Sequence, residues 1–265
     1  MKPETVSLLC GPETHEPLRL VLESGSDGHA QEVLVGVRSG DRFPVRDGIP
    51  LLLDESKISG FNQRYQGFYN RVAGLYDAGI RLFARLAGGG EEHFRGEYLR
   101  ELEVQESDRL LEVSIGTGAN LRYLPVKAAC FGVDLSWRML KRCQGNLKRW
   151  QLEAELMLGN AEELPLRDES FDAVLHVGGI NAFNDRAGAI REMIRVARAG
   201  AKIVIVDETA KMLESVAWAP SARKWLLEHG ERFSAPVGLL PEGMREVQAR
   251  DIVRGNMYCL TFRKP

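Results

Sequence analysis

The sequence contains few cysteines, and they are widely spaced. None of the four belongs to a C-x-x-C pair; they are Cys10, Cys130, Cys143 and Cys259. This spacing is that of neither a disulfide framework nor a zinc knuckle. We therefore expect reduced thiols and a cytoplasmic location.

An excess of charge and a long apolar run are also missing. The 35 Lys and Arg residues nearly balance 37 Asp and Glu, and the resulting formal charge of -2 is no electrostatic footprint for general nucleic-acid binding. Apolar runs such as 203–206 have the length of a strand, far short of the roughly 18 residues of a membrane span. Residues 1–5 lack the apolar region of a signal peptide. We expect no transmembrane segment and no nucleic-acid partner.

The residues that are present divide the chain into three zones. Residues 1–54 alternate short apolar runs with glycine-containing turns, which predicts a small β-rich cap. Residues 55–105 have apolar and aromatic residues three and four positions apart, which predicts helices at about 61–76 and 93–103. The stripe of the first helix consists of Phe61, Tyr65, Phe68, Tyr69, Val72, Leu75 and Tyr76.

Residues 106–265 alternate strands with helices. Strands are expected at 109–113, 129–133, 156–158, 171–175 and 202–206, and helices from 119, after Ser136 and over 185–197. This order predicts a doubly wound, mostly parallel sheet. The last two strands, 245–252 and 256–262, are joined by a tight turn and predict a hairpin. We therefore predict an α/β fold with a seven-stranded sheet, whose C-terminal edge strand runs antiparallel, beside the β-rich cap.

A glycine-rich turn follows the first strand of this domain. Gly116 and Gly118 allow backbone N–H groups to approach a ligand. Position 121 is leucine, whereas the nicotinamide-binding pattern G-x-G-x-x-G has a third glycine there, which counts against a dehydrogenase. Taken alone, the segment is also compatible with a purely structural turn.

The following strands add polar groups at the same edge of the sheet. The second strand ends at Asp134, whose carboxylate can accept both ribose hydroxyls of an adenosine ligand. The alternative for Asp134 is a charge at the start of the helix that follows Ser136. Residues 159–165 and 171–174 continue the pattern after the third strand and in the fourth. Open α/β sheets bind ligands at this edge.

These segments together resemble class I S-adenosylmethionine-dependent methyltransferases of the ubiquinone/menaquinone C-methyltransferase type (methyltransferase type 11). The patterns that carry the resemblance are E-x-x-x-G-x-G-x-N, G-V-D-L-S-x-x-M-L, N-A-E-x-L-P and S-F-D-A-V, in this order. Residues 72–77 are also similar to the family's lid helix. The resemblance implies S-adenosylmethionine as the cofactor and a helical lid or linker over residues 55–105.

The resemblance also implies a role for individual residues. Those implied around the methionine part of the cofactor are Tyr76, Glu112, Ser114, Gly116, Thr117, Gly118 and Asn120. Those implied around the ribose and adenine are Asp134, Leu135, Met139, Asn160 and Ala161. His176 and Val177 would lie near the sulfonium, and His176 is a candidate general base. The alternative for His176 is a structural hydrogen bond at a strand end.

Two residues depart from the family pattern. Ser114 replaces the first glycine of the turn, and Ala199 replaces a proline before the fifth strand. Serine favours negative φ, so we expect the turn at Ser114 to differ slightly from that of the family.

The N-terminal zone has a resemblance of its own. Residues 8–12 and 41–53 are similar to the small zinc-ribbon-like domain found beside some RNA methyltransferases. Zinc requires four nitrogen or sulfur ligands, whereas this zone offers Cys10, His15 and His29. We expect a degenerate domain without metal, stabilised by apolar packing.

The loop after the fourth strand bears on the substrate. Enzymes that methylate exocyclic amines of nucleic-acid bases commonly carry a D/N-P-P-Y/F signature there, and residues 176–181 lack it. This favours a small or lipid-like, quinone-type acceptor. The alternatives are an RNA methyltransferase, favoured by the N-terminal resemblance, and a non-catalytic cofactor-binding module that acts through a protein partner.

Overall fold

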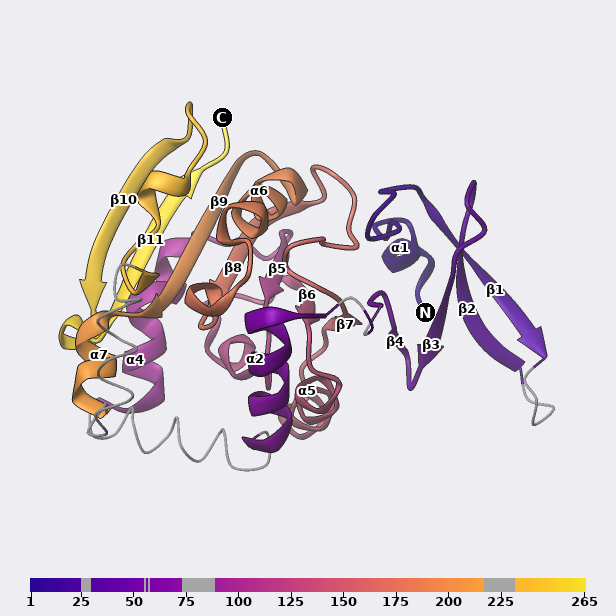
Figure 1. Ribbon diagram of the computed structural model, residues 1–265, viewed down its shortest axis with the longest axis horizontal. Coiled ribbons are helices and arrows are strands. Elements are labelled where there is room, and N and C mark those ends of the chain that lie inside the picture. Colours follow the sequence, from indigo (N-terminus) through magenta and orange to yellow (C-terminus); the bar gives the residue numbers. More distant parts are fainter. Residues whose placement is uncertain (25–29, 55, 57, 73–88, 217–231) are drawn as a thin grey trace.

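A computed structural model describes residues 1–24, 30–54, 56, 58–72, 89–216 and 232–265 of the chain. Within them the chain forms a four-stranded N-terminal sheet and a seven-stranded sheet (Figure 1). None of the helices in these ranges is both long and apolar enough to cross a membrane.

The N-terminal sheet belongs to residues 1–54, which we call the cap. Its strands pair antiparallel in chain order: β1 (Leu18–Ser24), β2 (Ala30–Gly36), β3 (Arg42–Arg46) and β4 (Ile49–Pro50). Burial alternates along β3, as expected for a strand with one face on a core. The short helix α1 (Pro3–Val6), which the sequence patterns did not predict, precedes them with a proline at its first position.

The seven-stranded sheet has the order β10-β11-β9-β8-β5-β6-β7. Its parallel strands are β5 (Arg109–Val113), β6 (Ala129–Asp134), β7 (Glu155–Leu158), β8 (Phe171–Val177) and β9 (Ala197–Glu208). β11 (Met257–Arg263) pairs antiparallel with β9, and β10 (Arg245–Ile252) pairs antiparallel with β11. The predicted fold class and the predicted C-terminal hairpin are therefore confirmed.

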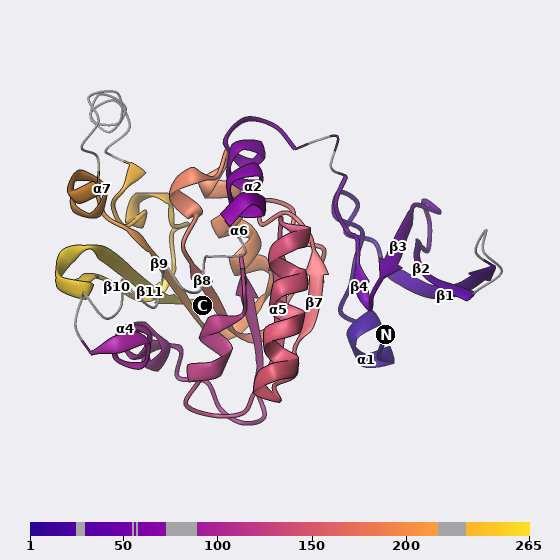
Figure 2. The same cartoon turned by 90° about the horizontal axis from the view of Figure 1, so that it is seen from below.

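Helices cover both faces of this sheet (Figure 2). α4 (Gly90–Leu99) and α5 (Trp137–Trp150) share one apolar core with the strands, and α6 (Arg186–Val196) belongs to a second core. Along β9, Ile203 and Ile205 face the α6 core while Val204 and Val206 face the other. Each of these side chains is fully buried, which stabilises the fold by about 1.5–3 kcal/mol per residue.

Two local predictions had opposite outcomes. The side chain of Ser136 accepts a hydrogen bond from the Met139 N–H at 3.1 Å, which confirms Ser136 as the N-cap of α5. The helix predicted from Ala119 is wrong, because residues 119–123 form only a 3-10 helix. Pro125 explains the early end, since the residue before a proline is driven into an extended conformation, and Leu124 has ψ 139°.

Two helices of the middle zone are present. α2 spans Gly60–Val72, and α4 continues into a 3-10 helix at Arg100–Leu102. The rest of the predicted aromatic stripe, including Tyr76, lies outside the described residues. After β9 the short helix α7 spans Ala210–Val216.

The cap packs on the β7 edge of the seven-stranded sheet, opposite the β10–β11 hairpin (Figure 1). Leu51 forms a parallel bridge with Leu158 of β7, and the Leu52 N–H donates to the Leu158 carbonyl at 2.9 Å. Further along, Leu9 pairs antiparallel with Leu166. The cap therefore contacts both the end of β7 and the loop that follows it.

We predict that Leu52→Ala destabilises the whole chain. Leu52 is fully buried in a core that includes residues of both the cap and the seven-stranded sheet, so truncation should lower the free energy of unfolding by about 2–4 kcal/mol. Chemical denaturation measures this, and Leu22→Ala is the matched control. Leu22 is 69% exposed on β1, and its loss should cost less than about 0.5 kcal/mol. Equal stability of the two variants would show that the cap is not packed as described.

Candidate cofactor site

Two adjoining cavities lie at the carboxyl edge of the parallel strands. We call the first, of about 220 Å³, the Glu112 cavity, and the second, of about 60 Å³, the Asp134 cavity. Both are lined by Ser114, Gly116, Val177 and Gly178. They occupy the edge where open α/β sheets bind their ligands.

The turn after β5 has an unusual backbone conformation. Ser114 has φ 60°, in the left-handed region, which costs a non-glycine residue about 1–3 kcal/mol. The prediction that serine changes the turn is wrong for the φ angle of residue 114, because Ser114 adopts the left-handed conformation that glycine favours. Gly118 has φ 73°, and a Cβ there would lie 2.6 Å from Cys143 Sγ. Glycine is therefore required at 118, where α5 passes beneath the turn.

Asp134 connects this turn to the next loop. Its Oδ2 accepts from the Gly116 N–H at 2.7 Å, and its Oδ1 accepts from the Ser136 N–H at 2.8 Å. Burial raises the pKa of Asp134 to about 6. Each carboxylate oxygen has a second lone pair, which a ribose hydroxyl can use. Asp134 thus accepts a hydrogen bond at the start of α5, which agrees with its alternative interpretation as a charge at the start of this helix. The predicted contact of Asp134 with the ribose is compatible with that role.

A polar network lies at the other end of the turn. The Asn120 amide donates to Glu112 Oε1 at 2.5 Å, and its Oδ1 accepts from Arg95 Nη1 at 2.5 Å and from the Tyr98 hydroxyl at 2.7 Å. Arg95 is in turn paired with Glu91, with 3.0 Å between Nη2 and Oε1. Helix α4 therefore supplies a cation to the site through Arg95.

Two atoms of this network are buried without a hydrogen-bond partner among the described residues. They are Glu112 Oε2 and Arg95 Nε, and both residues line the Glu112 cavity. An unsatisfied buried polar atom costs about 1–3 kcal/mol, so binding of a ligand that forms hydrogen bonds with both atoms is favoured. An α-amino acid has an ammonium for Glu112 and a carboxylate for Arg95. The site thus fits the methionine part of S-adenosylmethionine.

Sequence reasoning did not identify Arg95. Its helix was predicted from the spacing of apolar and aromatic residues, but no motif marks the position. Only the packing of α4 beside the Gly-rich turn brings this guanidinium to the cavity.

The structure brings most of the predicted residues together. Those that line one or both cavities are Glu112, Ser114, Gly116, Thr117, Asn120, Asp134, Leu135, Met139 and Val177. Gly118 lines neither cavity, but it lets α5 pass close to the turn. Ala161 is buried in the α6 core, and Asn160 Oδ1 accepts from the Glu162 N–H at 3.1 Å within its own loop. The adenine contacts of Asn160 and Ala161 stay predictions.

Helix α2 lies across the adenosine side of the site. The Gln66 amide donates to the Leu135 carbonyl at 2.9 Å, and the Asn62 amide donates to Glu162 Oε1 at 2.9 Å. Both residues also line the Asp134 cavity. α2 thus connects the loops after β6 and β7 and narrows the cavity between them.

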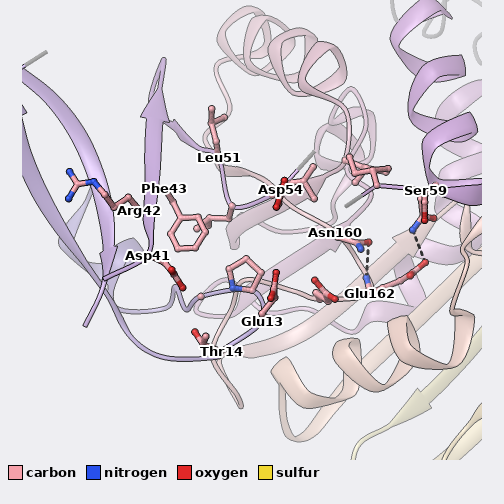
Figure 3. A pocket seen from close by; sticks show the side chains of 18 of the residues that line it. Glu13, Thr14, Asp41, Arg42, Phe43, Leu51, Asp54, Ser59, Asn160 and Glu162 are labelled. Atoms are coloured by element: carbon pink, nitrogen blue, oxygen red, sulfur yellow. Dashed lines mark hydrogen bonds between the residues drawn. The ribbon is translucent and has the colours of Figure 1, made fainter. Parts of the chain in front are cut away.

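A larger cavity of about 700 Å³, the cap cavity, lies between the cap and the start of α2 (Figure 3). The cap lines it with residues that include Phe43, Leu51 and Asp54, and the loop after β7 lines it with residues that include Asn160 and Glu162. Asn62 and Leu135 line both this cavity and the Asp134 cavity. The adenosine side of the site is therefore adjacent to the cap.

His176 has the surroundings of a structural histidine. Its side chain is fully buried, its Nδ1 lies 3.0 Å from the Val113 carbonyl oxygen, and its ring packs edge-on against Phe183. Burial lowers the pKa of His176 to about 4, so the ring is neutral at neutral pH. Neither cavity is lined by His176, although Val177 lines both. Its role as a general base stays a prediction that this geometry does not favour.

The described part of the chain contains no group of three or more His, Cys, Asp or Glu residues arranged to hold a metal ion. Cys10 is fully buried, and burial raises its thiol pKa to about 12. A degenerate zinc-ribbon-like origin for the cap stays a prediction.

Comparison with known proteins gives the class of the domain. Residues 111–205 match the sequence model of a methyltransferase domain family. A demethylmenaquinone methyltransferase of Porphyromonas gingivalis is 26% identical over 77% of this chain and 86% of its own length. The corresponding enzyme of Lactiplantibacillus plantarum is 29% identical, and a phosphatidylethanolamine N-methyltransferase of Cereibacter sphaeroides is 35% identical. The matches span 54% and 39% of this chain, and 61% and 52% of those two relatives.

Solved structures agree on the fold. A SAM-dependent methyltransferase of Thermotoga maritima has a TM-score of 0.53 at 19% identity, over 76% of this chain and 99% of its own. The [4+2]-cyclase SpnF has a TM-score of 0.55 at 17% identity, over 77% of this chain and 96% of its own. The chain thus carries a class I S-adenosylmethionine-dependent methyltransferase domain, and S-adenosylmethionine is its cofactor.

We predict that cofactor binding releases a proton from Glu112. Burial raises the pKa of Glu112 to about 8, so the free site carries a proton at pH 7, whereas a ligand ammonium requires the carboxylate. Affinity for S-adenosylhomocysteine should therefore rise as the pH rises from about 6.5 to about 8, by at most about tenfold per pH unit. Calorimetry at pH 7 in two buffers of different ionisation enthalpy should count close to one released proton.

Glu112→Gln is the control that tests whether the released proton comes from Glu112. The variant should bind more weakly and release no proton, while Asp134 still contributes its own titration at lower pH. Identical proton release in the variant and the unaltered protein would place the ammonium elsewhere.

We predict that α2 opens to admit the cofactor. Small-molecule sites commonly measure about 300–1,000 Å³, more than the two narrow cavities provide while α2 stays in place. Hydrogen exchange should therefore be fast over residues 60–72 in the free protein and slow once S-adenosylhomocysteine binds. Residues 137–150 of α5 are the internal reference, because this helix is packed on the sheet. Equal protection of α2 with and without ligand would show a permanently packed helix.

Proposed function

We propose that this protein transfers a methyl group from S-adenosylmethionine to a small or lipid-like acceptor of the quinone type. The observation that supports it is the apolar part of the lining of the Glu112 cavity. Phe94 of α4, Val177 of β8, Met212 of α7 and Met257 of β11 contribute to this lining, together with Glu208 of β9. An apolar wall with one polar group suits an acceptor that has an apolar body and a polar atom.

The chain contributes binding, orientation and exclusion of water. When bound, S-adenosylmethionine supplies an electrophilic methyl group on a sulfonium. Glu112 and Arg95 would hold its amino-acid end, and Asp134 would hold its ribose. Holding two reactants in one geometry removes much of the entropic barrier of a displacement. Closure of α2 would keep water out.

The curated relatives support the same class of acceptor. They are named for a quinone acceptor and for a phospholipid acceptor. The fold alone does not decide the activity, because a [4+2]-cyclase shares it. Methylation of RNA and a non-catalytic role through a protein partner are therefore outcomes that the experiment must distinguish.

We predict that methyl-labelled S-adenosylmethionine transfers its label to reduced demethylmenaquinone carrying a short isoprenyl chain. Vesicles of phosphatidylethanolamine and a structured RNA transcript complete the panel. Asp134→Ala is the control, because the loss of a buried charged acceptor should weaken cofactor binding by about 1–3 kcal/mol. Labelling of the RNA alone would contradict this proposal and would identify an RNA methyltransferase instead. Tight cofactor binding with no labelled product would favour the non-catalytic role.

A further inference from the structure

Helix α5 carries charge of one sign on its outward face. Between Trp137 and Trp150 the chain has five basic residues and no acidic one, although the whole chain has a formal charge of -2. The basic residues recur three, four or seven positions apart and therefore share one face of the helix; they are Arg138, Lys141, Arg142, Lys148 and Arg149. The opposite face is buried in the core through residues such as Leu140 and Leu147.

Two further arginines extend this charge beyond the helix. The guanidinium of Arg46, on β3 of the cap, lies 5.1 Å from the centre of the Trp137 ring at the start of α5. The guanidinium of Arg122, in the 3-10 helix before β6, lies 5.7 Å from the centre of the Trp150 ring at the end of α5. We call these seven basic side chains and the two half-buried tryptophans the α5 surface. It has cations along its length and an aromatic ring at each end.

The charge of the α5 surface is only partly balanced within the described part of the chain. Lys141 Nζ lies 2.9 Å from Asp47 Oδ2 in the cap. Lys148 and Arg149 are exposed, and no acid among the described residues forms an ion pair with either of them. Like charges three and four positions apart repel each other and destabilise a helix. A negatively charged partner would offset this repulsion.

The α5 surface begins beside the cofactor site. Leu135 and Ser136, which directly precede α5, line the Asp134 cavity. Arg138 Nη1 donates to the Asn70 carbonyl of α2 at 3.2 Å, so the basic face reaches the helix that we expect to open (Figure 2). A partner bound to the α5 surface would therefore lie next to α2 and to the cofactor site.

We propose that the α5 surface binds the face of an anionic lipid bilayer. Lys and Arg side chains close to an anionic membrane are attracted to it, and tryptophan is enriched where membrane and water meet. This inference rests on the proposed function for its choice of partner, because a lipid-like acceptor is dissolved in a bilayer. Binding there brings the cofactor site to the acceptor.

A nucleic acid is the other partner that suits basic residues with aromatic rings between them. Such proteins stack bases on the exposed faces of aromatic side chains. Here the guanidinium groups of Arg46 and Arg122 occupy a face of Trp137 and Trp150, respectively, and both rings are half-buried. The geometry therefore favours the bilayer, and the nucleic acid becomes an outcome of the test.

Vesicle binding, measured by co-sedimentation without any acceptor, tests the proposal. We expect the protein to bind phosphatidylcholine vesicles that contain about one third phosphatidylglycerol, and not pure phosphatidylcholine vesicles. Lys148→Gln combined with Arg149→Gln should weaken binding by about 25-fold, because each basic residue contributes about fivefold. Arg167→Gln combined with Arg245→Gln, which removes two exposed basic side chains elsewhere, is the matched control and should bind like the unaltered protein.

Three results of this experiment would overturn the proposal. The first is equal binding to anionic and neutral vesicles or to neither, and the second is an equal loss of binding in the two double variants. The third is binding of a structured RNA transcript without binding of anionic vesicles, which would assign the α5 surface to a nucleic acid.

Turnover separates this proposal from the choice of acceptor. With reduced demethylmenaquinone embedded in anionic vesicles, the variant altered at Lys148 and Arg149 should need more vesicles for half-maximal turnover, whereas in detergent micelles it should match the unaltered protein. An equal loss in vesicles and in detergent would contradict the docking role. Vesicle binding without methylation of any acceptor in the panel would refute the acceptor class alone. Methylation in detergent without vesicle binding would refute the α5 surface alone.

Discussion

The carboxylate of Asp134 is the contact on which the geometry of the site depends. It accepts one backbone N–H from the turn after β5 and one from the start of α5, so a single side chain fixes two loops of neighbouring strands. The left-handed backbone of Ser114 lies in the turn that this contact closes. Strain of this kind persists where the surrounding structure leaves no alternative, and it is common at ligand sites.

Charge is distributed unevenly around the Glu112 cavity. At the β5 and α4 side, Glu112 and Arg95 offer opposite charges to a zwitterion, and each has an unsatisfied buried atom. At the β9 and β11 side, Glu208 lies opposite Met257, and both residues line the cavity. The first arrangement suits binding of a fixed charge.

The strands could be predicted from sequence because buried parallel strands form continuous apolar runs, as at 203–206 and 173–175. Ser136 could be predicted because a helix N-cap is a local signal. The short helix at 119–123 could also have been anticipated, since Pro125 is visible in the sequence.

Other features of the site depend on contacts that the sequence does not display. Arg95 reaches Asn120 from a helix that carries no motif, so only tertiary packing identifies it. The sequence marks His176 as a titratable group at a strand end, but it does not show that the ring lies on the face opposite the cavity. The φ of Ser114 is set by its neighbours against its own preference.

The attachment of the cap has a consequence for assembly. A sheet edge is a template to which another chain can add a strand, and at Leu158 the cap already occupies the β7 edge. Among the described residues, β10 is the remaining edge of the seven-stranded sheet, and seven of its eight residues are exposed. Its charged side chains include Arg245, Glu246, Arg250 and Asp251. Such charges oppose strand addition, so the cap and the C-terminal hairpin together close the sheet to growth at either end.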